Sequence, residues 1–230
     1  MGNRYRNEQK YLLNKSDVAI LKMRLDAMME KDPHVRDGTS YLIRSVYFDD
    51  MYNSCLHEKE DGVNFRRKWR IRIYNCSDKV IHLECKEKAG NMTHKDSITV
   101  SREDVEAALS GNIKPDKNRE PLWNDFAMQV MTKGFRPATI VQYERIPYIW
   151  RPSNVRITID RCLSSSEIFD RFFDDDLPVR PIMARDLDLL EVKYDTLLPD
   201  HLRQVMNLKN MRYTSFSKYE LCRRMPMRAF

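Results

Sequence analysis

Hydrophobic and polar positions along the chain follow two periodicities. Every second residue is apolar in eight segments, which predicts β-strands at residues 5–13, 42–48, 67–74, 80–88, 97–100, 139–146, 155–160 and 189–194. Apolar residues spaced three or four apart predict helices at residues 16–29, 101–111, 121–133, 199–208 and 216–224. The helix ends carry typical signals: Ser16 and Asp17 as a first cap, a capping-box sequence from Ser101, and Pro121 with Gly134 at the two ends of the third helix.

These elements predict an α+β fold, an antiparallel eight-stranded β-barrel with flanking helices. The chain has 230 residues, which is within the range of one β-barrel domain. It contains only 6 glycines, no flexible linker and no internal repeat. We therefore expect a single domain over residues 1–230.

Composition narrows the class of protein. Hydrophobic residues make up 42% of the chain and charged residues 32%, and no apolar run is long enough to cross a membrane, so the chain is neither disordered nor membrane-spanning by composition. Five cysteines without metal-ligand spacing argue against a disulfide framework and a zinc site. The N-terminal sequence shows no signal peptide, and we expect a cytoplasmic protein.

Charge is concentrated on alternate strand positions. The net charge is +6, and the segment 64–95 alone carries nine Lys or Arg residues against three acids. In the strand 67–74, Trp69, Ile71 and Ile73 share one face, whereas Lys68, Arg70 and Arg72 share the other. The same division recurs in five further strands. Like charges side by side on one sheet face repel and are costly to bury without partners.

Two arrangements remove this repulsion: the charged faces are solvated outer surfaces, or they line a wet interior that holds a polyanion. Six strands with the same pattern favour the second arrangement, a barrel whose lumen is lined with cations. The cations expected on the inner face are Arg6, Lys10, Lys68, Arg70, Arg72, Lys86, Arg145, Arg156 and Lys193. Arginine and lysine together suit a chain of phosphates, and the carboxylates Glu8, Glu84 and Glu191 suit Mg²⁺ or Mn²⁺.

The strand motifs also resemble those of a known family. In sequence order these motifs are residues 6–11 (RNEQKY), 45–49 (SVYFD), 67–74 (RKWRIRIY), 83–86 (LECK), 143–145 (YER), 155–160 (VRITID), 190–194 (LEVKY) and 215–219 (SFSKY). Together they are similar to the vacuolar transporter chaperone (VTC) domain, the polyphosphate polymerase branch of the CYTH-like triphosphate tunnel metalloenzymes. The resemblance runs from about residue 4 to residue 219.

The resemblance implies a triphosphate tunnel fold that binds a nucleoside triphosphate such as ATP, together with Mn²⁺ or Mg²⁺, and extends an inorganic polyphosphate chain. It implies these phosphate ligands of the catalytic centre: Lys10, Arg70, Arg72, Lys86, Arg145 and Arg156. Further phosphate contacts are implied for Lys68, Lys95, Tyr143, Lys193, Ser217 and Lys218. Glu191 would hold the metal, with Glu8 and Glu84 as further candidates.

Two positions depart from the related motifs. Hydrolytic members of the superfamily begin with Glu-x-Glu-x-Lys, whereas this chain has Arg6 at the first glutamate, which favours a polymerase over a triphosphatase or cyclase. Polymerases often carry a lysine at the position of Ser215. The resemblance also implies a free-standing bacterial catalytic domain, and a membrane partner for product export is not visible in the sequence.

Other functions remain open. The chain could be a triphosphatase for inorganic or nucleoside triphosphates, or a non-catalytic module that binds polyphosphate or nucleotide. Nucleic-acid binding would need Trp69 or Tyr74 to stack on bases on the same face as the basic residues. Trp69 points to the other face of the strand from Arg70 and Arg72, so we expect no nucleic-acid partner. For Glu191 the alternative role is a salt bridge, and for Tyr143 it is packing within the barrel.

Overall fold

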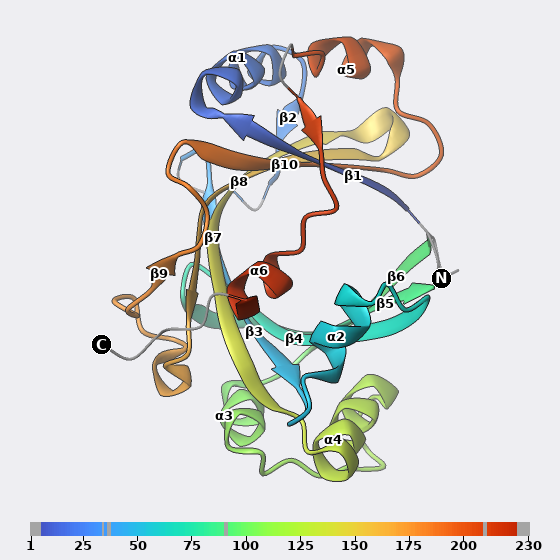
Figure 1. The fold of residues 1–230 in the computed structure, drawn as a ribbon, viewed down its shortest axis with the longest axis vertical. Coiled ribbons are helices and arrows are strands. Elements are labelled where there is room, and N and C mark those ends of the chain that lie inside the picture. The colour runs from blue at the N-terminus through green and yellow to red at the C-terminus, as the bar shows by residue number, and fades with distance from the viewer. Residues whose placement is uncertain (1–5, 34, 36–37, 90–91, 209–210, 225–230) are drawn as a thin grey trace. The chain divides into compact units, whose positions relative to one another are not determined.

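The computed structural model describes residues 6–33, 35, 38–89, 92–208 and 211–224 (Figure 1). All eight predicted strands are present: β1 (Asn7–Asn14), β3 (Tyr41–Asp49), β4 (Phe65–Tyr74), β5 (Ser77–Ala89), β6 (Met92–Thr99), β7 (Arg136–Trp150), β8 (Val155–Ser166) and β10 (Leu187–Tyr194). Three two-residue strands add to them: β2 (Glu30–Lys31), β9 (Arg180–Pro181) and β11 (Arg212–Tyr213). Tyr5, where the first strand was predicted to begin, lies outside the described residues.

The described strands form one eleven-stranded sheet in the order β11-β1-β10-β8-β7-β3-β4-β5-β6, with β2 paired to β7 and β9 to β8. The pairs whose register is resolved are antiparallel, as for β1 with β10 and β4 with β5. The structure therefore confirms an antiparallel α+β fold with flanking helices. Within the described part of the chain this order has two ends, β11 and β6, and closure into a barrel stays a prediction.

Six α-helices accompany the sheet: α1 (Lys15–Asp26), α2 (Ser54–Glu60), α3 (Arg102–Ser110), α4 (Pro121–Lys133), α5 (Asp200–Val205) and α6 (Lys218–Arg224). Two 3₁₀ turns, η1 (Arg151–Ser153) and η2 (Phe169–Arg171), complete the described elements. None of the helices in the described ranges is long and apolar enough to cross a bilayer.

The helix caps explain most of these boundaries. Ser101 and Asp104 form the predicted capping box of α3, and Gly134 ends α4 at a left-handed φ of 66° that glycine adopts without strain. The predicted cap of α1 at Ser16 and Asp17 is wrong. Asn14 caps this helix instead, because its side chain accepts a hydrogen bond from the Asp17 backbone N–H.

The chain divides into two compact units, each assembled from separate segments. Unit 1 comprises Met1–Leu42, Tyr143–Leu163 and Met183–Ser217, and unit 2 comprises Ile43–Gln142, Ser164–Ile182 and Lys218–Phe230. Strands β3, β7 and β8 contribute residues to both units. The prediction of one domain over residues 1–230 stays a prediction.

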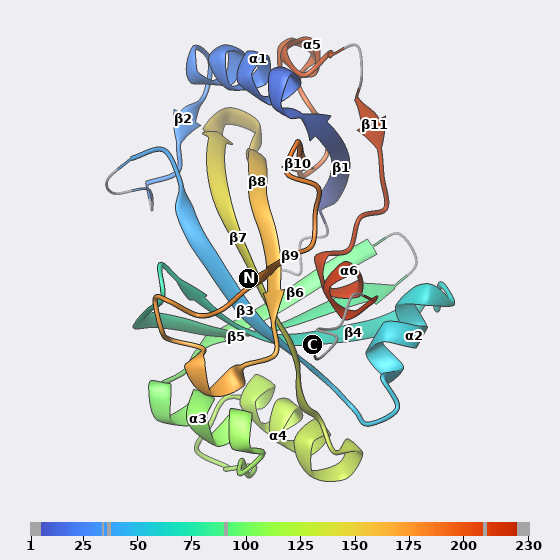
Figure 2. The same cartoon turned by 60° about the vertical axis from the view of Figure 1, so that its left-hand side comes forward.

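In unit 1, helices α1 and α5 lie side by side (Figures 1 and 2) and share a core with the strands. Leu21 and Leu202 from the helices are fully buried with Ile157 and Val192 from β8 and β10. Burying an aliphatic side chain of this size contributes about 1.5–3 kcal/mol. Because strand side chains alternate between faces, residues next to Ile157 and Val192 along the strands must point to the opposite face.

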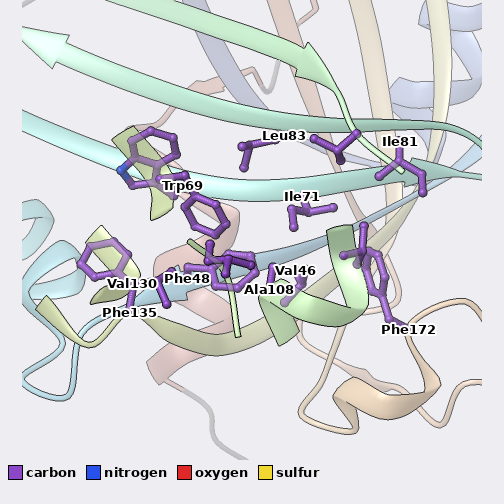
Figure 3. Close-up of a cluster of buried hydrophobic side chains, with 14 of the residues drawn as sticks. Val46, Phe48, Trp69, Ile71, Ile81, Leu83, Ala108, Val130, Phe135 and Phe172 are labelled. Carbon is purple, nitrogen blue, oxygen red and sulfur yellow. The ribbon is translucent and has the colours of Figure 1, made fainter. Parts of the chain in front are cut away.

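In unit 2, the predicted apolar face of β4 forms the core. Figure 3 shows Trp69, Ile71 and Leu83 gathered with Ala108 of α3 and Val130 of α4. All five side chains are buried, and they belong to one hydrophobic cluster. The charged positions between them therefore share the other face of β4 and β5.

Candidate functional site

The charged face of unit 2 is ordered in rows across neighbouring strands. Lys68 on β4 lies directly opposite Lys86 on β5, which lies opposite Lys95 on β6. In the next row, Arg70 lies opposite Glu84. Residues that are paired in this way have their Cβ atoms about 5 Å apart, so their side chains share one local environment. The register thus brings together five residues that the sequence predicted for the site.

Glu84 is the carboxylate at the centre of this face, and it is only 2% exposed. Its Oε2 lies 2.6 Å from the Arg70 guanidinium and 3.8 Å from Arg72 Nη1, and its Oε1 accepts a 2.8 Å hydrogen bond from Lys95 Nζ. Burial alone would raise the pKa of Glu84, but Arg70, Arg72 and Lys95 lower it far below its usual range. Both oxygens of Glu84 accept hydrogen bonds from cations, so Glu84 helps to position these cations, and its role as a metal ligand stays a prediction.

The strand β3 supplies hydroxyl groups to the same two arginines. Arg70 Nη1 donates a 2.9 Å hydrogen bond to the Tyr47 hydroxyl, and Arg72 Nε donates a 3.2 Å bond to Ser45 Oγ. Burial would raise the pKa of Tyr47, but Arg70 and Arg72 lower it. A guanidinium that is fixed on one side by hydroxyl and carboxylate groups keeps a defined orientation for the N–H groups that remain.

Helix α6 joins this cluster through Tyr219. The Tyr219 hydroxyl donates a short hydrogen bond to Asp49 Oδ2, and the Tyr219 ring lies 5.1 Å from the Tyr47 ring. Lys68 Nζ lies over the Tyr219 ring at 5.1 Å from its centroid. Lys218, a predicted phosphate ligand, begins the same helix, and its charge contributes to the lowered pKa of Tyr47.

The charged face of unit 1 consists of opposite charges in register. Glu8 on β1 pairs with Lys193 on β10, and Lys10 pairs with Glu191. Lys193 Nζ lies 3.4 Å from the nearest carboxylate oxygens of both Glu8 and Glu191. Lys10 Nζ lies 3.8 Å from Glu8 and 3.9 Å from Glu191. These two lysines and two glutamates therefore form a single ion-pair cluster.

Lys10 also fixes the segment that leads to α6. Its Nζ donates a 3.0 Å hydrogen bond to the Phe216 carbonyl, and its own carbonyl accepts one from the Thr214 backbone N–H. The predicted phosphate ligand Ser217 follows Phe216 directly, and it is half-buried in unit 1. The N-terminal and C-terminal predicted motifs therefore meet at Lys10.

Arg145 on β7 is the buried cation of unit 1. Its Nε and Nη2 each donate a 2.7 Å hydrogen bond to one oxygen of Asp160, and Nη2 lies 3.3 Å from Glu191. The Tyr143 ring lies 5.2 Å from the guanidinium carbon and is itself buried. Although burial alone would lower it, the pKa of Arg145 is raised by Asp160 and Glu191. The Tyr143 ring thus packs against the Arg145 guanidinium, a role that the sequence did not predict.

Arg156 on β8 pairs with Lys193 on β10 and has a carboxylate partner of its own. Its Nη2 donates a 2.6 Å hydrogen bond to Asp32, which is 2% exposed, and a 3.0 Å bond to the Tyr41 hydroxyl. Arg6 likewise lies 3.0 Å from Asp195. These partners change the predicted balance of charge, because the sequence interpretation counted only three carboxylates.

The two groups of predicted cations differ in the carboxylates that they contact. In unit 1, four predicted cations are matched by four carboxylates: Lys10, Arg145, Arg156 and Lys193 against Glu8, Asp32, Asp160 and Glu191. In unit 2, three predicted cations, Arg70, Arg72 and Lys95, contact the carboxylate of Glu84, and Lys68 and Lys86 lie in the adjoining row of the sheet. Cations gathered on one strand face attract anionic ligands.

The carboxylates that suit a divalent metal lie in unit 1. Glu8 and Glu191 flank the same lysine, and Mg²⁺ or Mn²⁺ binds through one or two carboxylates with phosphate oxygens and water completing its ligands. Across the described ranges, no three His, Cys, Asp or Glu side chains come together as a metal cluster. The donor set of Glu8 and Glu191 therefore fits an ion that is shared with phosphate rather than one held by protein alone.

Several residues of the two clusters were not assigned a role from the sequence. Alternation places Asp160 on the charged face with Arg156, and Tyr47 occupies an alternate position opposite Arg70, but neither residue was predicted for the site. Asp32 comes directly after the two-residue strand β2 and carries no such signal. Trp69 is 1% exposed in the core, so it is unable to stack on a nucleic-acid base.

Comparison with known proteins agrees with this fold. A crystal structure described as a putative adenylate cyclase from Bacillus halodurans is 14% identical over 89% of this chain and 87% of that chain, with a TM-score of 0.51. The PH1819 protein from Pyrococcus horikoshii OT3 is 13% identical over 94% of this chain and 97% of that chain, with a TM-score of 0.48. The Mimivirus capping enzyme triphosphatase is 14% identical over 89% of this chain and 86% of that chain, with a TM-score of 0.40. At these identities, the likeness to the first structure shows the fold. No curated protein matches the sequence.

The sequence itself matches one family model. The model of the VTC domain covers residues 5–225, which is nearly the whole chain. Together with the fold, this match supports a triphosphate-tunnel enzyme of the phosphoryl-transfer class. The chain belongs to the VTC domain family.

Proposed function

We propose that the protein is a polyphosphate polymerase, which transfers the γ-phosphate of ATP or another nucleoside triphosphate to a growing inorganic polyphosphate chain with the help of Mn²⁺ or Mg²⁺. The observation that carries this proposal is the group of cations, Arg70, Arg72 and Lys95, that contacts buried Glu84 in unit 2. Arginine and lysine side chains on one strand face suit a chain of phosphates, which presents negative charges at short intervals. Membership of the VTC domain family supports the same reaction.

The residues of unit 2 would bind and orient phosphate groups. Arg70 and Arg72 are held by Glu84, Tyr47 and Ser45, so their guanidinium groups are oriented before a ligand arrives. Phosphoryl transfer requires mainly positioning and charge stabilisation from a protein. Pre-oriented arginines meet that requirement because no reorganisation is needed as charge develops on the transferred group.

The residues of unit 1 would hold the metal ion and further phosphate oxygens. Glu191 and Glu8 would be its protein ligands, and Lys10, Arg145 and Lys193 would contact phosphate. The metal would neutralise negative charge on the phosphate oxygens that unit 1 binds. The nucleophile is the terminal phosphate oxygen of the acceptor chain, which attacks phosphorus in line as the nucleoside diphosphate leaves.

Product analysis tests the proposal directly. Purified protein with ATP and Mn²⁺ should yield ADP and a long acid-labile phosphate polymer. Lys10→Ala and Glu191→Ala should each lower the rate of polymer synthesis by about 100-fold or more. Each substitution removes a group that is proposed to bind phosphate or its metal ion and so to stabilise negative charge in the transition state. Lys114→Ala, at an exposed position far along the sequence from the charged strands, is the matched control and should leave the rate unchanged.

The competing reactions give different products. A triphosphatase would release ADP and free phosphate in equal amounts with no polymer. A non-catalytic module would bind polyphosphate and consume no ATP. Either result with folded wild-type protein would overturn the polymerase proposal.

A further inference from the structure

The row of three lysines in unit 2 is a direct juxtaposition of like charges. Lys68, Lys86 and Lys95 face each other across β4, β5 and β6. Like charges directly opposite each other in a sheet are destabilising. Lys95 contacts Glu84 at 2.8 Å, and Lys68 lies at the other end of the row, beside helix α6.

The surroundings of Lys68 disfavour its charged form. Positive groups face it from three elements: Lys59 of α2, Arg66 of β4 and Lys86 of β5. On α6, the Glu220 carboxylate opposes them, and the Tyr219 ring lies against the amine. Burial and then these three cations lower the pKa of Lys68 from 10.5 to about 7.

We propose that Lys68 is a proton acceptor of the phosphate site, whose amine takes up a proton when a phosphate group binds to the lysine row. The geometric basis is the position of the amine, which lies 5.1 Å from the centroid of the Tyr219 ring at one end of the row of three lysines. An arriving phosphate brings the negative charge that stabilises the ammonium form. The inference rests on the proposed function in one respect, that phosphate binds on this face.

The proton has a defined source and destination. A phosphate whose second pKa is about 6 still carries a proton on a small fraction of molecules at neutral pH. That proton passes from the phosphate oxygen to the lone pair of Lys68 Nζ, or a water molecule supplies it and leaves hydroxide to the buffer. No bond to phosphorus changes in this step. A terminal phosphate of the acceptor chain that binds here is thereby fully deprotonated, which makes its oxygen the stronger nucleophile.

The pH dependence of binding of ATP in metal-free buffer tests this inference without reference to turnover. Between pH 7.5 and 9 the terminal phosphate of ATP is already deprotonated, and arginines and ordinary lysines keep their charge. If binding requires the ammonium form of Lys68, the Kd of wild-type protein for ATP should rise by up to about tenfold per pH unit in this range. Calorimetry at each pH measures this Kd.

Variants assign the pH dependence to its residue. Lys68→Arg stays charged throughout and should bind with a Kd that no longer depends on pH, and Lys68→Met should bind weakly and also independently of pH. Lys79→Met, an exposed lysine of β5, should behave as wild type. Tyr47 also has a lowered pKa, so its titration is an alternative source of the slope. If Lys68 is the source, Tyr47→Phe should keep the slope.

The outcomes separate this inference from the proposed function. A wild-type Kd without a slope, a slope that persists in Lys68→Arg, or a slope that disappears in Tyr47→Phe would overturn the role of Lys68 while phosphate binding stands. A folded protein that binds no ATP at any pH would overturn the proposed function and this inference with it.

Discussion

Arg145 and Asp160 form a parallel pair of hydrogen bonds between β7 and β8, each 2.7 Å long, with both side chains almost completely buried. This two-point contact fixes the plane of the guanidinium and leaves its Nη2 edge 3.3 Å from Glu191. The relationship makes Asp160 a positioning residue for the cation that the sequence predicted as a phosphate ligand.

Asp160→Asn should therefore destabilise the protein strongly. The substitution leaves Arg145 buried with a weakened partner, and breaking a buried ion pair costs about 3–5 kcal/mol. Unfolding in urea measures this change. The exposed pair Arg151 and Glu30, 2.9 Å apart, is the control, and Arg151→Ala should cost less than about 1 kcal/mol. Equal effects of the two substitutions would contradict the buried role of Asp160.

Glu191 and Glu84 should respond differently to removal of their charge. Glu191→Gln takes away a proposed metal ligand, so the Mn²⁺ concentration for half-maximal activity should rise at least tenfold. Glu84→Gln should leave that concentration unchanged and lower kcat by roughly 100-fold, because Arg70 and Arg72 lose their common anchor. Metal titrations of activity at saturating ATP distinguish the two. A shifted metal requirement in Glu84→Gln would restore its predicted role as a metal ligand.

The core of unit 2 depends on Trp69. Its ring lies 5.4 Å from the ring of Phe126, and both side chains are buried. Trp69→Ala should lower the free energy of unfolding by about 3–5 kcal/mol through lost contacts and the cavity that remains. Met131→Ala, at an exposed position of α4, should change it by less than about 0.5 kcal/mol. Denaturant unfolding of the two variants provides the comparison.

The five cysteines should react at very different rates. Burial raises the pKa of Cys85 and that of Cys222 to about 12, and Cys55 is also buried with a raised pKa, whereas Cys162 is exposed. Because the thiolate is the reactive form, a disulfide reagent at pH 8 should label Cys162 first and the buried thiols only on unfolding. Peptide mapping after brief labelling identifies the modified residue. Rapid labelling of Cys85 would contradict the packing of β5 against the core.

The long strands were predictable because their alternation is strong. In β4 every apolar residue from Trp69 to Ile73 is buried, as the pattern indicates. Helix α2 was missed because Ser54–Glu60 has no apolar periodicity and Cys55 is its one buried residue. Its first backbone amides are capped by the side chains of Asp49 and Asp50, which belong to the preceding strand and turn. Such a helix depends on tertiary contacts rather than on its own sequence.

The shared strand faces of the candidate site were predictable, whereas the distant partners of its cations were not. Alternation placed Lys68, Arg70 and Arg72 on one face, and the register confirms that they share it with Lys86. Sequence alone gave no partner for Arg156, because Asp32 lies 124 residues away in the chain. Local patterns identify which side chains share a strand face, but they do not show which distant carboxylates neutralise them.

The one-for-one matching of charges in unit 1 makes binding there an exchange of partners. Under the proposed function, a phosphate that engages Lys10 and Lys193 would take them away from Glu191, and the released carboxylate would then attract a divalent cation. Each ligand would thus improve the affinity for the other, and by thermodynamic linkage the two effects would be equal in size. Metal and phosphate should bind to unit 1 cooperatively, and neither should bind tightly alone.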